Sequence, residues 1–408
     1  MTESPPDLTT GERIRYHRER RGMSRPVLAG LVGRSPDWLK KVERGDRPVR
    51  SLAMLSKLAQ ALRLDDLAKL TGADSTGPVT DVGKLSHPSV PAFRDAIHLG
   101  LFRRPQALPE SVEVLSGRVR QAWDTWHSSA HQRTEVGAAL PALLAAVHAA
   151  TRRTEGPERR QMYAVMAEAY ALAQQFAAHT TEPELYWIVV DRARMAAEES
   201  DDPVLLAFAA WVSANGLRAA GHTDEALGQV IDAAESLRPR LEHGSDSLRA
   251  IFGALCLHAG ITYGQEGEDG NAWYWWGEAD RTAGKLPVGY LDPWTAFSPG
   301  NVSVSGVTIG VDLRTPGAAL QRAAETVPES VLSVERRSRL FIDTARSEFA
   351  RKEYASALHW LGKGFDTSPE GVRYVPVGRR LAADLALQSP PSLRGDARNL
   401  AERVGVAA

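Results

Sequence analysis

The chain has 408 residues, of which 43% are hydrophobic and 24% are charged. This length predicts two or three folding units, and this composition excludes a fibrous or largely disordered protein. The net charge of -1 is unevenly distributed, because Gly11 to Arg50 holds twelve basic and five acidic residues, a net of +7 that leaves -8 for the remainder.

The N-terminal segment, MTESPPDLTTGERIRYHRERRG, lacks the apolar core of a signal peptide, and no uninterrupted apolar stretch in the chain is long enough to span a bilayer. We therefore expect a cytoplasmic protein that does not enter the membrane. A basic segment attached to an acidic remainder is the pattern expected of a nucleic-acid-binding module joined to a part that does not bind nucleic acid.

Residues 10–70, which we call the head, read as several short helices separated by compact turns. Gly22 and Gly33 mark helix ends, and Ser24 and Ser35 are N-cap residues of the helices that follow. A last helix is predicted from about Ser51 to Leu62, where leucines recur at helical spacing. The sequence therefore predicts a small helical bundle at the N-terminus.

The head resembles the helix-turn-helix domains of the xenobiotic-response-element (XRE) family, which is related to phage repressors. The resemblance rests on a basic first helix, a short second helix that begins after a serine, a turn, a recognition helix and a Glu-Arg-Gly turn. In this chain those parts are Arg13 to Arg21, Ser24 to Val32, Gly33-Arg34, Ser35 to Val42 and Glu43-Arg44-Gly45. The resemblance implies binding of double-stranded DNA by a homodimer, on a palindromic operator.

The recognition helix would present its first turn to the edges of the bases in the major groove. Lysine can donate to guanine and Asp37 can accept from cytosine, whereas the arginines that follow the helix are better suited to phosphate. The predicted DNA-contacting residues are Arg25, Arg34, Ser35, Pro36, Asp37, Lys40, Lys41, Arg44, Arg47 and Arg50.

Residues 71–91 are predicted to be a linker, since glycines and prolines crowd this stretch. Residues 92–408, which we call the body, show an alanine- and leucine-rich helical pattern in which small residues recur at offsets of +12 and +7. The three copies are Ala214, Ala226, Ala233; Gly260, Ala272, Ala279; and Ala345, Ala357, Gly364. Leu286 to Arg314 breaks this pattern and is expected to be an insertion or a long loop that opens into a helix near Asn301.

The small-residue spacing is similar to that of tetratricopeptide (TPR) repeats, in which two antiparallel helices approach closely at small side chains. The fold class expected is all-α, with an XRE-type bundle followed by a TPR-like α-solenoid. The combination is similar to bacterial regulators that sense peptide pheromones, and the alanine-, arginine- and tryptophan-rich composition is typical of actinobacteria.

A solenoid leaves a concave surface that suits a peptide, a small molecule or a partner protein. The resemblance implies a ligand held by asparagine and aromatic side chains carried on the repeats. The candidates are Tyr186, Trp211, Asn215, Trp273, Trp294 and Asn301. For each of these the alternative is a structural role: the aromatic residues as core, and Asn301 as a helix cap.

No metalloprotease, phosphate-binding-loop or hydrolase-elbow motif occurs, so we expect no enzyme and no cofactor. His127 and His131 are four residues apart but have no evident third ligand, so no metal site is predicted. Cys256 lies in the apolar run IFGALCLHAG and is expected to be buried.

The sequence therefore predicts a sequence-specific transcriptional regulator whose body mediates dimerisation and binds a signal. The alternative is a protein-interaction scaffold or adaptor in which the body binds a partner protein and DNA binding is secondary. An enzyme within the helical body is a third class, and it would require a converging acid-base pair in a deep pocket.

Overall fold

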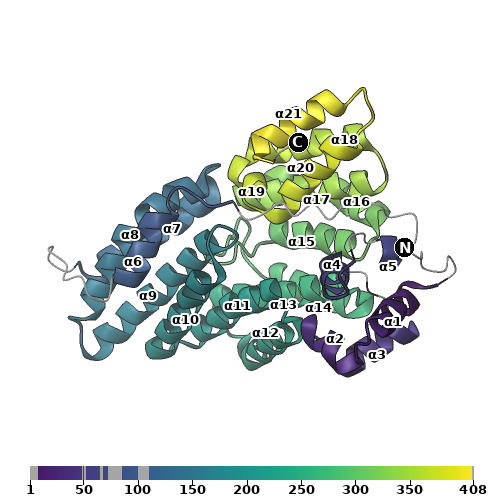
Figure 1. The fold of residues 1–408 in the computed structure, drawn as a ribbon. Coiled ribbons are helices and arrows are strands. Elements are labelled where there is room, and N and C mark those ends of the chain that lie inside the picture. Colours follow the sequence, from purple (N-terminus) through teal and green to yellow (C-terminus); the bar gives the residue numbers. More distant parts are fainter. Residues whose placement is uncertain are drawn as a thin grey trace.

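The computed structural model describes residues 8–47, 49, 52–64, 68–71, 85–99 and 110–406. Within these ranges the chain is helical and contains no β-strand. Figure 1 shows the N-terminal helices as a small group beside a long, curved stack of helices. The predicted all-α class, with an N-terminal bundle followed by a repeat-like helical body, is confirmed.

Five short helices with their own hydrophobic core form the head. The first begins earlier than predicted, because Thr9 and Glu12 form a capping box in which Glu12 accepts from the Thr9 backbone N–H at 2.8 Å. Ile14, Leu28 and Leu58 are fully buried in the shared core. The helices are α1 (Thr10–Arg20), α2 (Arg25–Leu31), α3 (Pro36–Arg44), α4 (Leu52–Ala61) and α5 (Ala68–Thr71).

The rest of the described chain is a stack of helices joined by short turns. Most of the predicted linker, residues 72–84, lies outside the described residues. The body helices are α6 (Val90–Leu99), α7 (Val112–Ser128), α8 (Gln132–Thr151), α9 (Gly156–Ala177), α10 (Pro183–Ser200), α11 (Pro203–Ala220), α12 (Thr223–Leu237), α13 (Asp246–Glu266), α14 (Asp269–Ala283), α15 (Pro299–Asp312), α16 (Pro316–Glu325), α17 (Val334–Ala350), α18 (Tyr354–Thr367), α19 (Pro369–Arg373), α20 (Pro376–Gln388) and α21 (Arg394–Val404), with 3₁₀ turns at Arg238–Arg240 and Pro328–Ser330.

The three small-residue copies fall on three packed helix pairs, α11–α12, α13–α14 and α17–α18. In each pair the first small residue lies on the first helix and the other two on the second. The close approach is seen at Gly260, where an added Cβ would lie 3.0 Å from the carbonyl oxygen of Ala272. Eight of the nine positions are buried, and Ala233 is partly buried. The spacing therefore predicted the pairing of these helices correctly.

The two ends of the body lie against each other. Helix α7 packs against α17, and the carboxylate of Glu370 in α19 accepts from the backbone N–H of Arg133 in α8 at 2.6 Å. Burial of the Glu370 carboxylate would raise its pKa, but hydrogen bonds, among them that from Thr134, lower the pKa overall. These contacts bring helices that are far apart in sequence against each other, although the apolar cores of the two ends remain separate.

Residues 284–298 form the predicted long loop between α14 and α15, and the loop reaches into the body. The Pro293 carbonyl accepts from His127 of α7 at 2.9 Å, and the Trp294 ring stacks on Phe208 of α11 with centroids 4.9 Å apart. The loop ends at Ser298, whose hydroxyl accepts from the backbone N–H of Asn301 at 3.2 Å. Asn301 is therefore inside α15, and Ser298 is the residue that caps the helix.

The same loop contacts a half-buried carboxyl group of α9. Trp294 Nε1–H donates to Glu168 of α9 at 3.1 Å, and burial raises the pKa of Glu168 to about 7, with Asp292 and Asp202 adding to the rise. A carboxyl group with a raised pKa binds more protons in the folded chain than in the unfolded one. Stability is then lost as the pH rises from about 4.5 to about 7.

We therefore expect Glu168→Gln to raise the free energy of unfolding at pH 8 by up to about 3 kcal/mol and to leave it unchanged at pH 4. The introduced amide keeps an oxygen that accepts from Trp294. Urea unfolding at both pH values measures the effect, and Glu158→Gln, at an exposed position of α9, is the control. An unchanged pH dependence would show that the carboxyl of Glu168 titrates normally.

Two described helices, α8 and α11, are long and apolar enough by composition to cross a bilayer, each with a mean hydropathy of 1.2. About half of each apolar window is buried inside the body. Core helices of water-soluble proteins commonly pass this test, so the finding is weak evidence for a membrane span.

Cys256 is fully buried in α13, as predicted.

Candidate nucleic-acid interface

Helix α3 begins sharply, as its sequence predicts. Ser35 accepts from the backbone N–H of Trp38 at 3.1 Å, and Pro36 occupies the first turn. Gly33 has a φ of 70° in the turn before the helix, and Gly45 ends the helix at a φ of 82°. Both values lie in the left-handed region that favours glycine.

One buried carboxylate fixes α3 to the helices before it. Glu43, near the end of α3, accepts from Arg18 of α1 at 2.5 Å and from Arg25 of α2 at 2.7 Å. The Glu43 side chain is 1% exposed, so the two guanidinium groups compensate a charge that is out of water. The glutamate of the Glu-Arg-Gly turn therefore sets the orientation of α3 against α1 and α2.

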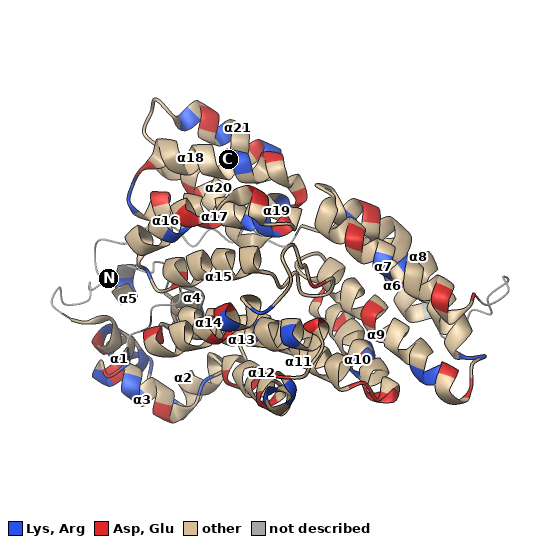
Figure 2. Ribbon diagram, turned by 180° about the vertical axis from the view of Figure 1, so that it is seen from behind, with Lys and Arg blue, Asp and Glu red and all other residues tan. Residues whose placement is uncertain are grey.

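The packing of α3 separates an apolar face from a charged one. Trp38, Leu39 and Val42 are buried in the core of the head. The outer face carries Asp37, Lys40, Lys41 and Arg44, all of which are exposed. Figure 2 shows basic residues on α1 and α3 at one corner of the molecule. The exposed cations stand on a rigid helix, which is the arrangement that base-edge recognition in a major groove requires.

The head rests on the body through ion pairs. Arg34, in the turn before α3, donates to Glu266 of α13 at 2.6 Å, and its guanidinium lies 5.6 Å from the centroid of the Trp38 ring. Arg47 donates to Glu268 at 2.6 Å. The ammonium of Lys57 is 3.4 Å from the carbonyl oxygen of Ala220 at the end of α11.

A pocket of about 370 Å³ lies at this contact. Its lining includes Arg47 of the head and Asp224, Glu266 and Glu268 of the body. Asp224 is a further neighbour of Arg34, at 3.7 Å. Burial lowers the pKa of Lys57, and the nearby Arg34 lowers it further. The head thus meets the body where the body is acidic.

The predicted DNA-contacting residues therefore fall into two groups. Ser35, Pro36, Asp37, Lys40, Lys41 and Arg44 lie on or next to the exposed face of α3. In contrast, Arg25, Arg34 and Arg47 are engaged within the chain, with Glu43, Glu266 and Glu268 respectively. Arg50 lies outside the described residues.

Sequence reasoning missed the acceptors of these arginines. Glu43 is visible in the Glu-Arg-Gly motif, but its role in joining three helices depends on the bundle geometry. Glu266 and Glu268 lie at the α13–α14 turn, more than 200 positions from Arg34 and Arg47. The net negative charge of the body was the sole signal in the sequence that pointed to them.

Among the predicted ligand residues, Tyr186 and Asn215 lie near the same arginine, Arg218 of α11. Arg218 donates to the side-chain oxygen of Asn215 at 3.2 Å. The Tyr186 hydroxyl accepts from Gln174 at 2.6 Å, and burial raises the pKa of this phenol to about 12. Tyr186 is close enough to Arg218 to influence the pKa of that guanidinium.

The other four candidates have partners elsewhere in the body. Trp211 is 7% exposed and stacks on Phe208, which in turn stacks on Trp294. Trp273 donates to Asp269 at 3.2 Å and has the guanidinium of Arg322 4.3 Å from its ring centroid. Asn301 is 7% exposed within α15. The six residues therefore do not meet in one place.

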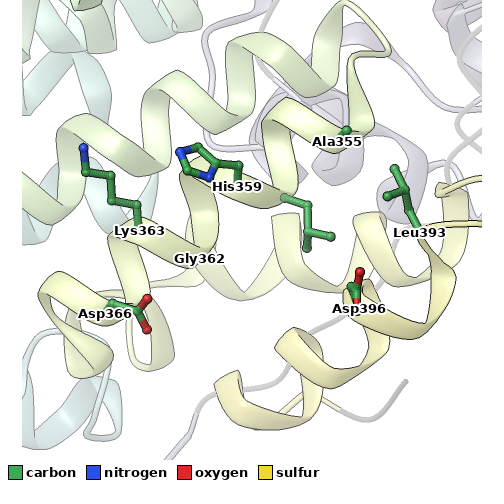
Figure 3. Close-up of a pocket in the computed structure, with 8 residues that line it drawn as sticks. Ala355, His359, Gly362, Lys363, Asp366, Leu393 and Asp396 are labelled. Carbon is green, nitrogen blue, oxygen red and sulfur yellow. The ribbon is translucent and has the colours of Figure 1, made fainter.

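Another pocket, of about 510 Å³, lies near the C-terminus between α18 and α21 (Figure 3). His359, Lys363 and Asp366 of α18 and Asp396 of α21 line it. None of the predicted ligand residues lines this pocket or the one at the head.

His127 occupies a structural position. Its ring nitrogens contact Pro293 at 2.9 Å and Ser333 at 3.1 Å, and burial lowers the pKa of the imidazole. His131 is the residue that precedes α8. The described part of the chain holds no cluster of three or more histidine, cysteine or acidic side chains placed to bind a metal.

Comparisons with known proteins identify the head. A family model described as "Helix-turn-helix domain" matches residues 10–70. No curated protein sequence matches the chain. Among solved structures, the chain is similar to the crystal structure of ComR from S. thermophilus in complex with DNA and its signalling peptide ComS. The two sequences are 13% identical, the match covers 98% of this chain and 100% of that chain, and the TM-score is 0.24. A TM-score this low supports no functional argument. Residues 10–70 are therefore a helix-turn-helix domain.

Proposed function

We propose that this chain is a DNA-binding transcriptional regulator that recognises a specific sequence through α3. The observation that carries the proposal is the exposed face of α3, where Lys40, Lys41 and Arg44 stand on a helix that Glu43 and a buried apolar face hold in place. The match of residues 10–70 to the helix-turn-helix model supports the same function. Lysine and arginine are the side chains that most often read guanine and contact phosphate.

The body, in this proposal, controls when the head binds. Arg34 and Arg47 are suited to phosphate, but here they pair with the carboxylates of Glu266 and Glu268. A DNA backbone placed against these arginines would meet the acidic side chains of the body. The head must therefore separate from the α13–α14 turn before all its cations contact DNA, and a signal that favours separation favours binding.

The remaining parts of the proposal follow the resemblance to XRE-type regulators. Residues 10–70 are the DNA-binding domain, residues 71–91 a linker and residues 92–408 the sensor and dimerisation domain. A cytoplasmic homodimer with two heads would read the two half-sites of a palindromic operator about one helical turn apart. Two half-sites provide the discrimination that a single small head lacks.

The experiment that tests this function is selection of DNA ligands from a random pool by the full chain at physiological salt. We expect one enriched, palindromic motif that binds at least about a thousandfold tighter than random DNA. We also expect the affinity to fall steeply between about 50 and 200 mM salt, because phosphate contacts release counterions. Binding without sequence preference would instead favour a protein-interaction scaffold.

A further inference from the structure

Three arginines from two helices lie near one another on the body: Arg218 of α11, and Arg336 and Arg339 of α17. We call them the arginine cluster. Arg336 and Arg339 are close enough that the charge of each lowers the pKa of Arg218. Together with burial, which is the main cause, they bring that pKa to about 10. Three like charges in one place require a compensating negative charge.

The carboxylates around the cluster are largely committed to other arginines. Asp343 is fully buried and accepts from Arg339 at 2.7 Å and from Arg346 at 2.7 Å. Asp312 accepts from Arg346 at 2.9 Å through Oδ1, its Oδ2 is buried without a hydrogen-bond partner in the described chain, and its charge raises the pKa of Arg218. Glu335 lies 3.3 Å from Arg336. Arg339 and Arg336 therefore have acidic partners, whereas no carboxylate forms an ion pair with Arg218 within the described chain.

Arg218 is left with a neutral partner and an unused donor. Its Nη2 donates to Asn215 Oδ1 at 3.2 Å, and its Nη1 is inaccessible to solvent and has no hydrogen-bond partner in the described chain. A guanidinium nitrogen in this state costs stability, because it has lost water without gaining an acceptor. The neighbouring Arg336 and Arg339 keep 29% and 23% of their side chains exposed, so solvent reaches part of the cluster.

We infer that the arginine cluster binds the carboxylate group of a signal ligand, with Arg218 as its main donor. A carboxylate offers two oxygens in the geometry that a guanidinium fork prefers. It would also balance the one positive charge that Asp312, Glu335 and Asp343 leave in excess among Arg218, Arg336, Arg339 and Arg346. Asn215 and Tyr186, beside Arg218, add an amide and a phenol that can orient the rest of the ligand. The inference rests on the proposed function, since it specifies the ligand class of the sensing body.

A carboxylate can come from a small organic acid or from the C-terminus of a peptide, and the probes separate these sources. The full chain is titrated with succinate, with N-acetyl-tetraalanine and with N-acetyl-tetraalanine amide, each against sodium chloride of equal ionic strength. The thermal midpoint and calorimetric binding are measured for the wild type and for Arg218→Met. We expect a saturable rise of about 2 °C with at least one carboxylate, none with the amide, and none with R218M.

A second readout keeps the inference testable if the variant changes the fold. Because the charge of Arg218 has no carboxylate partner, R218M without ligand should unfold at a higher temperature than the wild type. Arg238→Met is the matched control, since Arg238 pairs with Glu235 at 2.9 Å and Glu278 at 2.8 Å. This control should unfold at a lower temperature and keep the response to carboxylate.

Two outcomes would overturn the inference. One is a wild type in which neither carboxylate stabilises the chain beyond chloride; the other is an R218M variant that responds like the wild type. The assay contains no DNA, so its failure leaves the proposed DNA binding intact. Conversely, if no DNA motif is selected, a measured binding of carboxylate by the cluster remains valid.

Discussion

Replacing Lys40 and Lys41 with alanine is expected to weaken specific DNA binding by the full chain strongly. Both side chains are exposed on α3, and Asp37 is 3.1 Å from Lys41, which holds that lysine near the first turn of the helix. Each lost base contact costs about 1–3 kcal/mol of discrimination, so two contacts lower the affinity for the selected site by at least about thirtyfold. Competition between selected and random DNA measures this loss.

The control for this prediction removes the same number of charges elsewhere. Lys285→Ala with Arg153→Ala takes two exposed cations from the body. We expect this variant to bind the selected site like the wild type. If K40A/K41A keeps the wild-type preference for the selected site, α3 does not read the bases.

Neutralising the acidic side of the head–body contact is expected to have the opposite effect. Glu266→Gln with Glu268→Gln removes both carboxylates that hold Arg34 and Arg47. The pair with Arg34 is buried, with 2% and 10% of the two side chains exposed, and breaking such a pair costs about 3–5 kcal/mol. The docked state of the head is then no longer more stable than the separated state. We therefore expect the apparent affinity for DNA, measured by fluorescence anisotropy, to rise by about tenfold or more.

Removing negative charge anywhere on the body also raises affinity for a polyanion. Glu242→Gln with Glu329→Gln is therefore the control, because both carboxylates are exposed and neither is a partner of Arg34 or Arg47. We expect the control to raise affinity much less than E266Q/E268Q. Equal effects of the two double variants would mean that the ion pairs do not restrain the head.

Much of the head could be predicted from sequence because its signals are local. Ser35 and Pro36 define the start of α3 within one residue, and the buried positions Trp38, Leu39 and Val42 recur at helical spacing. The DNA-contact roles of the exposed residues remain predictions. What the sequence did not indicate is that Arg34 and its neighbours are already paired, since the acceptors come from a distant part of the chain.

The body was predictable in its helix pairs but not in its candidate ligand site. Small residues such as Gly260 indicate where two consecutive helices pack closely, and this packing depends on residues that are near one another in sequence. The site at Arg218 depends instead on how α11 and α17 come together, and on which carboxylates are used by other arginines. Of the residues chosen by chemistry alone, Tyr186 and Asn215 lie beside Arg218, whereas Trp211 and Asn301 are buried.

The most direct measurement is DNA cleavage by a reagent tethered to α3. Cys256 is fully buried, and burial raises the pKa of its thiol, so Asp37→Cys introduces one reactive thiol at an exposed position. With iron–EDTA attached there, we predict cleavage confined to a few base pairs around each half-site of the selected DNA, and none from the same reagent on Glu242→Cys of the body. Cleavage spread evenly along the DNA, or absent from D37C, would contradict insertion of α3 into the major groove.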